Sequence, residues 1–222
     1  IQPLIALGRA GKLQGVHWQV VGFQHRMGVA PGEDEHFGWS EYLLYHRQRG
    51  FAFLVDAEDG WNLVRPTTGA PRLAANGQSA SYLGKTYTLL YQYQAETDYV
   101  LGEFYWPVER GQTTFNRDFA QARGLLSMEQ SGTEITWSSG DRLDSAVVAQ
   151  AFGLQDKQEL LRRQDAAPVA LASGRGVLVV VLLLFLLVFL LVVFSDTPGS
   201  SGGGLRSAGG SYGGYSSGGS HK

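Results

Sequence analysis

Glu41 and Glu103 are the residues of this sequence best suited to acid–base chemistry or cation binding, because each lies among aromatic residues. In an extended chain Glu41 shares a face with Trp39, and Glu103 shares a face with Tyr105. A carboxyl group among aromatic side chains loses part of its hydration, which prepares it for acid–base work or for binding a cation. The alternative is structural, with each glutamate bonded to backbone groups or paired with an arginine across a sheet.

Trp39 and Trp106 complete the set of candidate ligand-binding residues, because tryptophan and tyrosine side chains of this region could line a ligand cleft. Aromatic residues that alternate along strands also fill protein cores, so a core role stays open for both tryptophans. The predicted site therefore consists of Glu41, Glu103, Trp39 and Trp106.

Several other chemistries are excluded by the residues present. The chain has no cysteine, and its histidines form neither HExxH nor a His-x-His pair, so we expect no metal site. The acidic run Glu33–Glu35 lacks the spacing of a calcium loop and is expected to be solvated, although it could contact a polyamine or a divalent cation. Neither a Gly-x-Ser-x-Gly elbow nor a phosphate loop occurs, so no enzyme activity and no cofactor are predicted.

The elements that position these residues are predicted to be strands. Period-two alternation and turn residues predict an all-β, antiparallel meander or barrel-like fold. Residues 66–80 are expected to form a surface loop, and residues 110–124 a polar segment with one helical turn. The expected strands cover residues 11–22, 38–50, 51–56, 61–65, 84–94, 97–106, 125–130 and 134–138.

The two halves of this β-rich region resemble each other. Gly15-x-x-Trp18-x-Val20 is matched by Gly84-x-x-Tyr87-x-Leu89, and each is followed by a strand with a glutamate among aromatic residues. The pattern indicates either an internal duplication or a chance similarity between two strands.

After Gly140 the period changes, and Asp144 or Ser145 can cap a short helix that docks on the sheet. The soluble domain is therefore assigned to residues 1–154. Residues 155–176 are strongly polar at first and are predicted to form a helical neck and linker.

Val177–Phe194 is a run of eighteen Val, Leu and Phe residues without a charge, an amide or a hydroxyl group. A helix of this length spans about 27 Å, close to the roughly 30 Å hydrocarbon core of a bilayer. It therefore predicts a transmembrane helix. Arg162, Arg163 and Arg175 precede it, which places residues 1–176 in the cytoplasm and the tail outside. Residues 195–222 are rich in Gly and Ser and are expected to be disordered.

Five stretches together give the chain a family resemblance: Trp39–Leu44, Phe53–Val55 with Trp61, Gly102–Trp106, Leu126–Glu129, and Glu134–Trp137 with Gly140. Over residues 10–155 the sequence resembles the bacterial domain-of-unknown-function family 4178. The resemblance implies a β-rich domain that often accompanies membrane segments and sometimes follows a Cys-rich ribbon. Gene neighbourhoods of such domains imply membrane-stress systems or polyamine-related enzymes. Because the chain begins at Ile1, we also expect further residues upstream.

These observations lead to a functional expectation. The chain is expected to be a single-pass membrane protein whose cytoplasmic β-domain binds a protein partner or a ligand at the bilayer. A net charge of −2 argues against nucleic-acid binding, which needs a basic face. The alternatives are a membrane-tethered enzyme and a polyamine or cation binder, both using Glu41 and Glu103.

Overall fold

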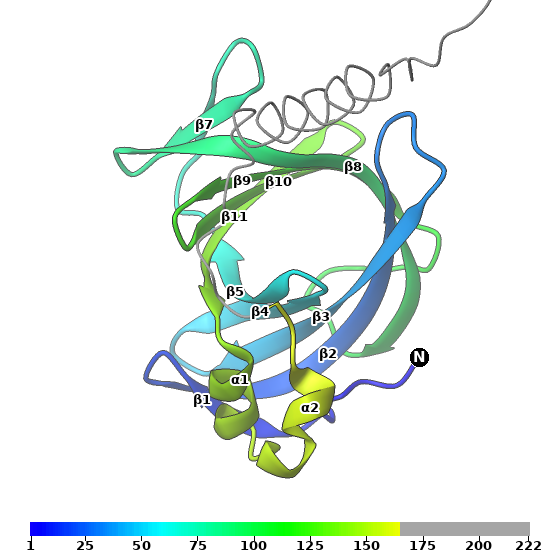
Figure 1. Cartoon of the computed structure of the whole chain (residues 1–222), viewed down its shortest axis with the longest axis vertical. Coiled ribbons are helices and arrows are strands. Elements are labelled where there is room, and N and C mark those ends of the chain that lie inside the picture. Colours follow the sequence, from blue (N-terminus) through cyan, green and yellow to red (C-terminus); the bar gives the residue numbers. More distant parts are fainter. Residues whose placement is uncertain (165–222) are drawn as a thin grey trace, which may run out of the picture. The chain divides into compact units, whose positions relative to one another are not determined.

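A computed structural model of the chain describes residues 1–164, and residues 165–222 lie outside that part. Eight antiparallel strands close into a barrel, because β2 pairs with β8 as well as with β3 (Figure 1). The barrel strands are β2 (Val16–Val29), β3 (His36–His46), β4 (Gly50–Ala57), β5 (Gly60–Pro66), β8 (Lys85–Gly102), β9 (Thr113–Gln121), β10 (Gly124–Ser131) and β11 (Glu134–Leu143). The predicted all-β, antiparallel, barrel-like fold is confirmed.

Two four-stranded meanders, β2–β5 and β8–β11, build the barrel and meet at the β2–β8 and β5–β11 pairs. Each meander is preceded by a hairpin whose two turn residues both have positive φ, Gln14-Gly15 and Leu83-Gly84. This is the geometry of the turn that fits the twist of a tight hairpin, and it explains why Gly occupies the same place in both sequence motifs. Glu41 lies on β3, whereas Glu103 follows the end of β8, so the two glutamates are not equivalent positions.

Short elements flank the barrel. They are β1 (Ala10–Leu13), β6 (Arg72–Leu73), β7 (Ser79–Tyr82), the helix α1 (Ser145–Ala151), a 3₁₀ turn at Gln155–Lys157 and the helix α2 (Gln158–Leu161). Figure 1 shows β1, α1 and α2 outside the ring of strands, below β2–β5. Residues of β2–β5 that contact these helices therefore belong to the outer face of the barrel.

The larger hydrophobic core lies on that outer face. Trp18, Tyr42 and Trp61 are at most 1% exposed, and they belong to one cluster with Val148 and Phe152 of the helical region. Side chains of a strand alternate between its two faces, so the neighbours of these residues point into the barrel. A second outer cluster joins the hairpin β6–β7 and β8 to β9 and β10, with Phe119 and Leu126 at its centre.

Four local predictions were wrong. Residues 113–121 form the strand β9, where a helical turn was expected. Residues 84–106 were expected to form two strands, but β8 is one strand of 18 residues that ends at Gly102. The expected loop at residues 66–80 contains β6 and the start of β7. In addition, the expected first strand is divided by the Gln14-Gly15 turn into β1 and β2.

Asp144 is the N-cap residue of α1, as expected, but its side chain makes no capping hydrogen bond; its backbone carbonyl accepts the first bonds of α1 from Val147 and Val148. Gly153 has a φ of +61°, a left-handed conformation that suits the end of a helix. Leu161 is buried in the larger core, so the packed chain continues beyond Leu154.

Among residues 1–164, no helix combines the length and the apolar composition that crossing a bilayer requires. The predicted transmembrane helix, Val177–Phe194, lies outside the part of the chain that the structure describes. The same holds for residues 165–176 of the predicted neck and for the predicted disordered tail, residues 195–222.

Candidate functional site

A charged network fills part of the barrel interior, and Glu41 is one of its centres. Gln24 lies directly opposite Glu41 across the β2–β3 pair, and Arg26 lies opposite Trp39. Trp39 Nε1 donates a hydrogen bond to Glu41 Oε1 at 2.6 Å, and Gln24 Nε2 donates to Glu41 Oε2 at 2.6 Å. Both carboxylate oxygens of Glu41 are therefore held by side chains of the same inner face.

Arg26 connects this wall of the barrel to the opposite wall. Its Nη1 lies 3.8 Å from Glu41 Oε1 and donates to Glu129 Oε2 of β10 at 2.5 Å, while Nη2 donates to Thr114 of β9. Burial alone would lower the pKa of the Arg26 guanidinium, but the carboxylates of Glu41 and Glu129 outweigh burial and raise it. Arg26 therefore stays protonated inside the barrel, between two carboxylates.

Asp118 is a second inner acid, on β9. Tyr93 donates a hydrogen bond to Asp118 Oδ2 at 2.8 Å, and Ser127 donates to Oδ1. Burial nevertheless raises the pKa of Asp118, and the nearby carboxylates of Asp59 and Glu41 raise it further. Burial and Asp118 in turn raise the pKa of the Tyr93 phenol well above its ordinary value. Other carboxyl groups around the interior therefore influence the charge of Asp118.

The inner acids outnumber the inner bases. Glu41, Asp118 and Glu129 point inward, and Asp59 forms an ion pair with the inward-facing Arg142. Among residues 1–164, Arg26 and Arg142 are the two arginines that take part in this network. The network thus has an excess of carboxyl groups, and such an interior attracts cations when the acids are ionised.

Several buried polar atoms of the interior lack a hydrogen-bond partner. They are Arg26 Nε, Arg142 Nε and Asn62 Oδ1, and each of these residues is at most 8% exposed. Asn62 and Arg142 lie opposite each other in the β5–β11 pair. A buried polar atom without a hydrogen-bond partner lowers the stability of the fold. A polar ligand in the interior could supply the missing partners of these atoms.

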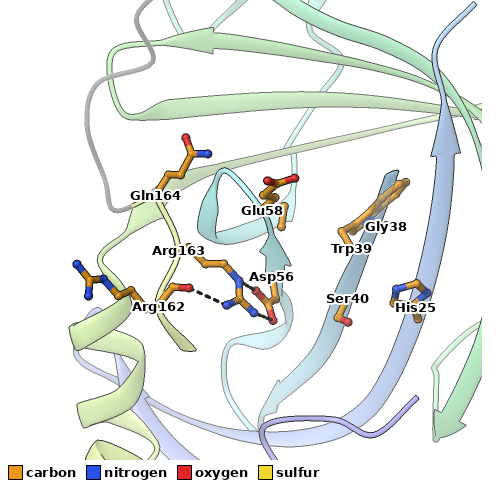
Figure 2. Close-up of a pocket in the computed structure, with 10 residues that line it drawn as sticks. His25, Gly38, Trp39, Ser40, Asp56, Glu58, Arg162, Arg163 and Gln164 are labelled. Atoms are coloured by element: carbon orange, nitrogen blue, oxygen red, sulfur yellow. Dashed lines mark hydrogen bonds and ion pairs between the residues drawn. The ribbon is translucent and has the colours of Figure 1, made fainter. Parts of the chain in front are cut away.

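A surface pocket of about 550 Å³ lies on the outer side of the same strands (Figure 2). His25 and Ser40 line it from β2 and β3, and Arg163 closes one side through a two-pronged ion pair with Asp56, at 2.7 and 2.9 Å. Burial raises the pKa of Asp56, although its ion pair with Arg163 opposes this effect. Because Trp39 also lines this pocket, the pocket reaches the edge of the charged network.

His25 has a defined orientation in this pocket. Its Nδ1 lies 2.7 Å from Asp98 Oδ1, so Nδ1 donates and Nε2 is the nitrogen left on the other side of the ring. A Cβ atom at Gly38 would lie 3.0 Å from that Nε2. Glycine at position 38 therefore leaves this nitrogen room beside the backbone of β3.

The structure brings together two of the four predicted site residues. Glu41 and Trp39 are hydrogen-bonded partners inside the barrel. Glu103 is exposed in the chain reversal after β8, and Trp106 packs on Phe53 with ring centroids 5.6 Å apart. No contact links Glu41 to Glu103 in the described range, so the two carboxyl groups do not form one site.

Sequence reasoning missed the residues that surround Glu41 from other strands. Arg26, Glu129 and Asp118 come from β2, β10 and β9, and only the closed barrel brings them together. The signal that could have found them is the spacing of Gln24 and Arg26, two polar residues on one face of a strand. The acidic run Glu33–Glu35 is exposed, and no group of three or more His, Asp or Glu suited to a metal occurs within residues 1–164.

Comparisons with known proteins identify a family. A model of the domain of unknown function DUF4178 matches residues 6–145, which is more than half of the chain and covers all eight barrel strands. No curated protein and no solved structure matches the chain. The chain therefore belongs to the DUF4178 family of domains of unknown function.

Proposed function

We propose that this chain is a single-pass membrane protein whose barrel domain binds a ligand or a protein partner beside the bilayer. The apolar run Val177–Phe194 supports attachment to the membrane, which we call the membrane tether, because the run is long enough to cross the hydrocarbon core and has no polar side chain. Arg162, Arg163 and Arg175 precede the span and favour a cytoplasmic barrel domain. The bilayer is therefore the first partner in this proposal.

The observation that supports binding is the charged interior of the barrel. Two packed apolar cores already lie on the outer face, so the interior charges are not needed to build a core. Buried ion pairs contribute little to stability compared with apolar packing. Burial raises the pKa of Asp118, and acids with a perturbed pKa concentrate at functional sites. The arrangement of Arg26, Glu41, Glu129 and Asp118 is thus better explained by recognition than by folding.

A cationic ligand is the second candidate, and the excess of inner carboxyl groups favours it. An amine could donate to Glu41 or Glu129 and compete with Arg26 for them, as charge-assisted hydrogen bonds are strong in such sites. Glu103 has no part in this candidate, because it is exposed outside the barrel. An enzyme mechanism that uses the carboxylates of both Glu41 and Glu103 gains no support, because Glu41 lies inside the barrel and Glu103 is exposed to solvent.

Calorimetry tests the cationic ligand. The full chain in detergent is titrated with spermidine and, separately, with common divalent cations. We expect heat of binding for the wild type and for Glu103→Gln, and at least a tenfold weaker affinity for Glu41→Gln. Equal affinities of the two variants, or no heat for any cation, would remove the interior as a cation site.

Membrane extraction tests the tether. We expect the full chain expressed in cells to stay in the membrane pellet after washing with alkaline carbonate. A variant that lacks residues 177–194 should appear in the supernatant. If the full chain is washed off, the apolar run is not a span and the tethered model fails.

A further inference from the structure

A partly exposed aromatic patch lies at the β3–β4 end of the barrel. It is formed by side chains of the β3–β4 hairpin and of the segment after β8, and we call it the aromatic end patch: Tyr45, Phe51, Phe53, Phe104, Tyr105 and Trp106. Phe51 stacks on Tyr105 with ring centroids 4.3 Å apart, and Tyr105 meets Trp106 at 4.2 Å. The rings therefore form one continuous surface.

The patch is partly exposed at this end of the barrel, since Phe51, Phe53, Phe104 and Trp106 are half-buried while two tyrosines face solvent. Tyr45 is 38% exposed and Tyr105 is 53% exposed, and neither belongs to the hydrophobic clusters. The backbone holds the second segment in place, since Glu103 N donates to Val21 O at 3.0 Å and Phe104 lies over Gly22. A contiguous exposed apolar surface on an ordered segment marks a contact site.

Unpaired positive charge borders the patch. Arg47 and Arg49 flank Gln48 in the turn between Tyr45 and Phe51, all three are exposed, and neither arginine has an ion pair within residues 1–164. The acid next to the patch is Glu103. Aromatic rings beside arginines match the headgroup level of an anionic membrane, where rings sit at the interface and cations meet lipid phosphates and carboxylates.

The length of the chain permits this contact. The last described residues dock near Asp56, at the end of β4 away from the patch, and the eight residues of β4 span about 26 Å. Twelve residues, 165–176, separate that point from the apolar run, and a chain of this length reaches at most about 40 Å. The tether is therefore long enough for this end of the barrel to reach the bilayer.

We infer that the aromatic end patch, with Arg47 and Arg49, docks on the headgroups of an anionic bilayer. The inference rests on the proposed membrane tether, and it adds an orientation: the β3–β4 end of the barrel faces the lipid. The span alone fixes only the distance of the domain from the membrane. The patch fixes which surface of the barrel remains free for a partner.

A single fluorescent label tests the orientation, because the natural chain has no cysteine. Gln48→Cys in the full chain is labelled with an environment-sensitive dye and reconstituted into vesicles of phosphatidylcholine, with or without about one-third phosphatidylserine. We expect a blue shift and quenching by headgroup spin-labelled lipid in the anionic vesicles. Removing both arginines, with Arg47→Gln and Arg49→Gln, should weaken docking about fivefold per arginine.

Controls separate the inference from the tether on which it rests. A label at Asp34→Cys, in the loop between β2 and β3, should remain unquenched, and Arg72→Gln should leave the signal at position 48 unchanged. Vesicle flotation reports the tether independently. Chains that float without quenching at position 48 overturn only the orientation, whereas chains that do not float overturn both. Equal shielding in neutral vesicles would show that the patch does not require anionic headgroups, and it would also overturn the inference.

Discussion

At the scale of single residues, the two predicted glutamates prove to have different roles. Glu41 accepts hydrogen bonds from Trp39 and Gln24 and lies beside Arg26, whereas Glu103 is exposed. Strand alternation correctly placed Trp39 on the same face as Glu41, but it does not apply to Glu103, which lies beyond the end of β8. The sequence could not indicate that Arg26 lies beside Glu41, since this proximity depends on the pairing of β2 with β3 and on closure of the barrel.

The substitutions Glu41→Gln and Glu103→Gln should differ in stability. We expect Glu41→Gln to lower the free energy of unfolding by about 2 kcal/mol. The two hydrogen bonds that the Glu41 carboxylate accepts would weaken, while Arg26 would retain its hydrogen bond to Glu129. For a chain of this size this loss of free energy corresponds to a fall of about 4–8 °C in Tm. Glu103→Gln should change stability by less than about 0.5 kcal/mol, as exposed substitutions usually do. Thermal unfolding of both full-length variants in detergent gives the comparison, and equal shifts would contradict it.

Asp118 should make stability depend on pH in a predictable direction. Burial raises its pKa from the ordinary value of 3.8, so the folded state favours the protonated carboxyl. This contribution is fully present below about pH 4, and it is lost as the pH rises through the folded pKa. Asp118→Asn keeps a neutral side chain at every pH. The Tm of the variant minus that of the wild type should therefore increase between pH 4 and pH 7, and parallel profiles would contradict this account.

At the scale of elements, the sequence predicted those strands whose outer face is apolar, and it missed β9. The inward residues of β9 are Thr114, Asn116 and Asp118, and on its outer face Arg117 interrupts the alternation. A strand that lines a polar interior lacks the apolar alternation that sequence analysis detects. The site was missed in part for the same reason, because its residues lie on that inner face.

Close approach of β11 to β5 depends on a glycine. A Cβ atom at position 140 would lie 2.0 Å from the carbonyl oxygen of Leu63 and 2.7 Å from Val64 Cα. We expect Gly140→Ala to destabilise the domain by about 3 kcal/mol, because backbone atoms must shift. Gly15→Ala is the matched control: its φ is +79° but no atom lies within 4 Å, so it should cost only about 1 kcal/mol. Similar Tm values for the two variants would show that the β5–β11 pair can relax.

The C-terminal segment is held to the barrel by a small number of contacts. Arg163 pairs with the buried Asp56, Arg163 N donates to Ser145 Oγ, and Trp61 Nε1 donates to Leu161 O at 2.7 Å. Removing the charge with Arg163→Gln leaves a buried carboxylate without its partner, so we expect the segment 158–164 to detach more often. Limited proteolysis should then cut there at least tenfold faster, while the exposed Arg162→Gln should leave the rate unchanged. Equal rates for the two variants would mean that the apolar contacts of Leu161 are sufficient.

At the scale of the whole molecule, the proposed membrane span predicts on which side of the membrane the barrel domain lies. Arg162, Arg163 and Arg175 precede the run, while Asp196 and one cation, Arg206, follow it closely. Because cations near a span are retained on the cytoplasmic side, the barrel domain should lie inside the cell and the tail outside. Protease added to intact cells should remove a tag at Lys222 and leave a tag at Ile1 intact. The opposite pattern would place the barrel outside, where the aromatic end patch would meet the other leaflet.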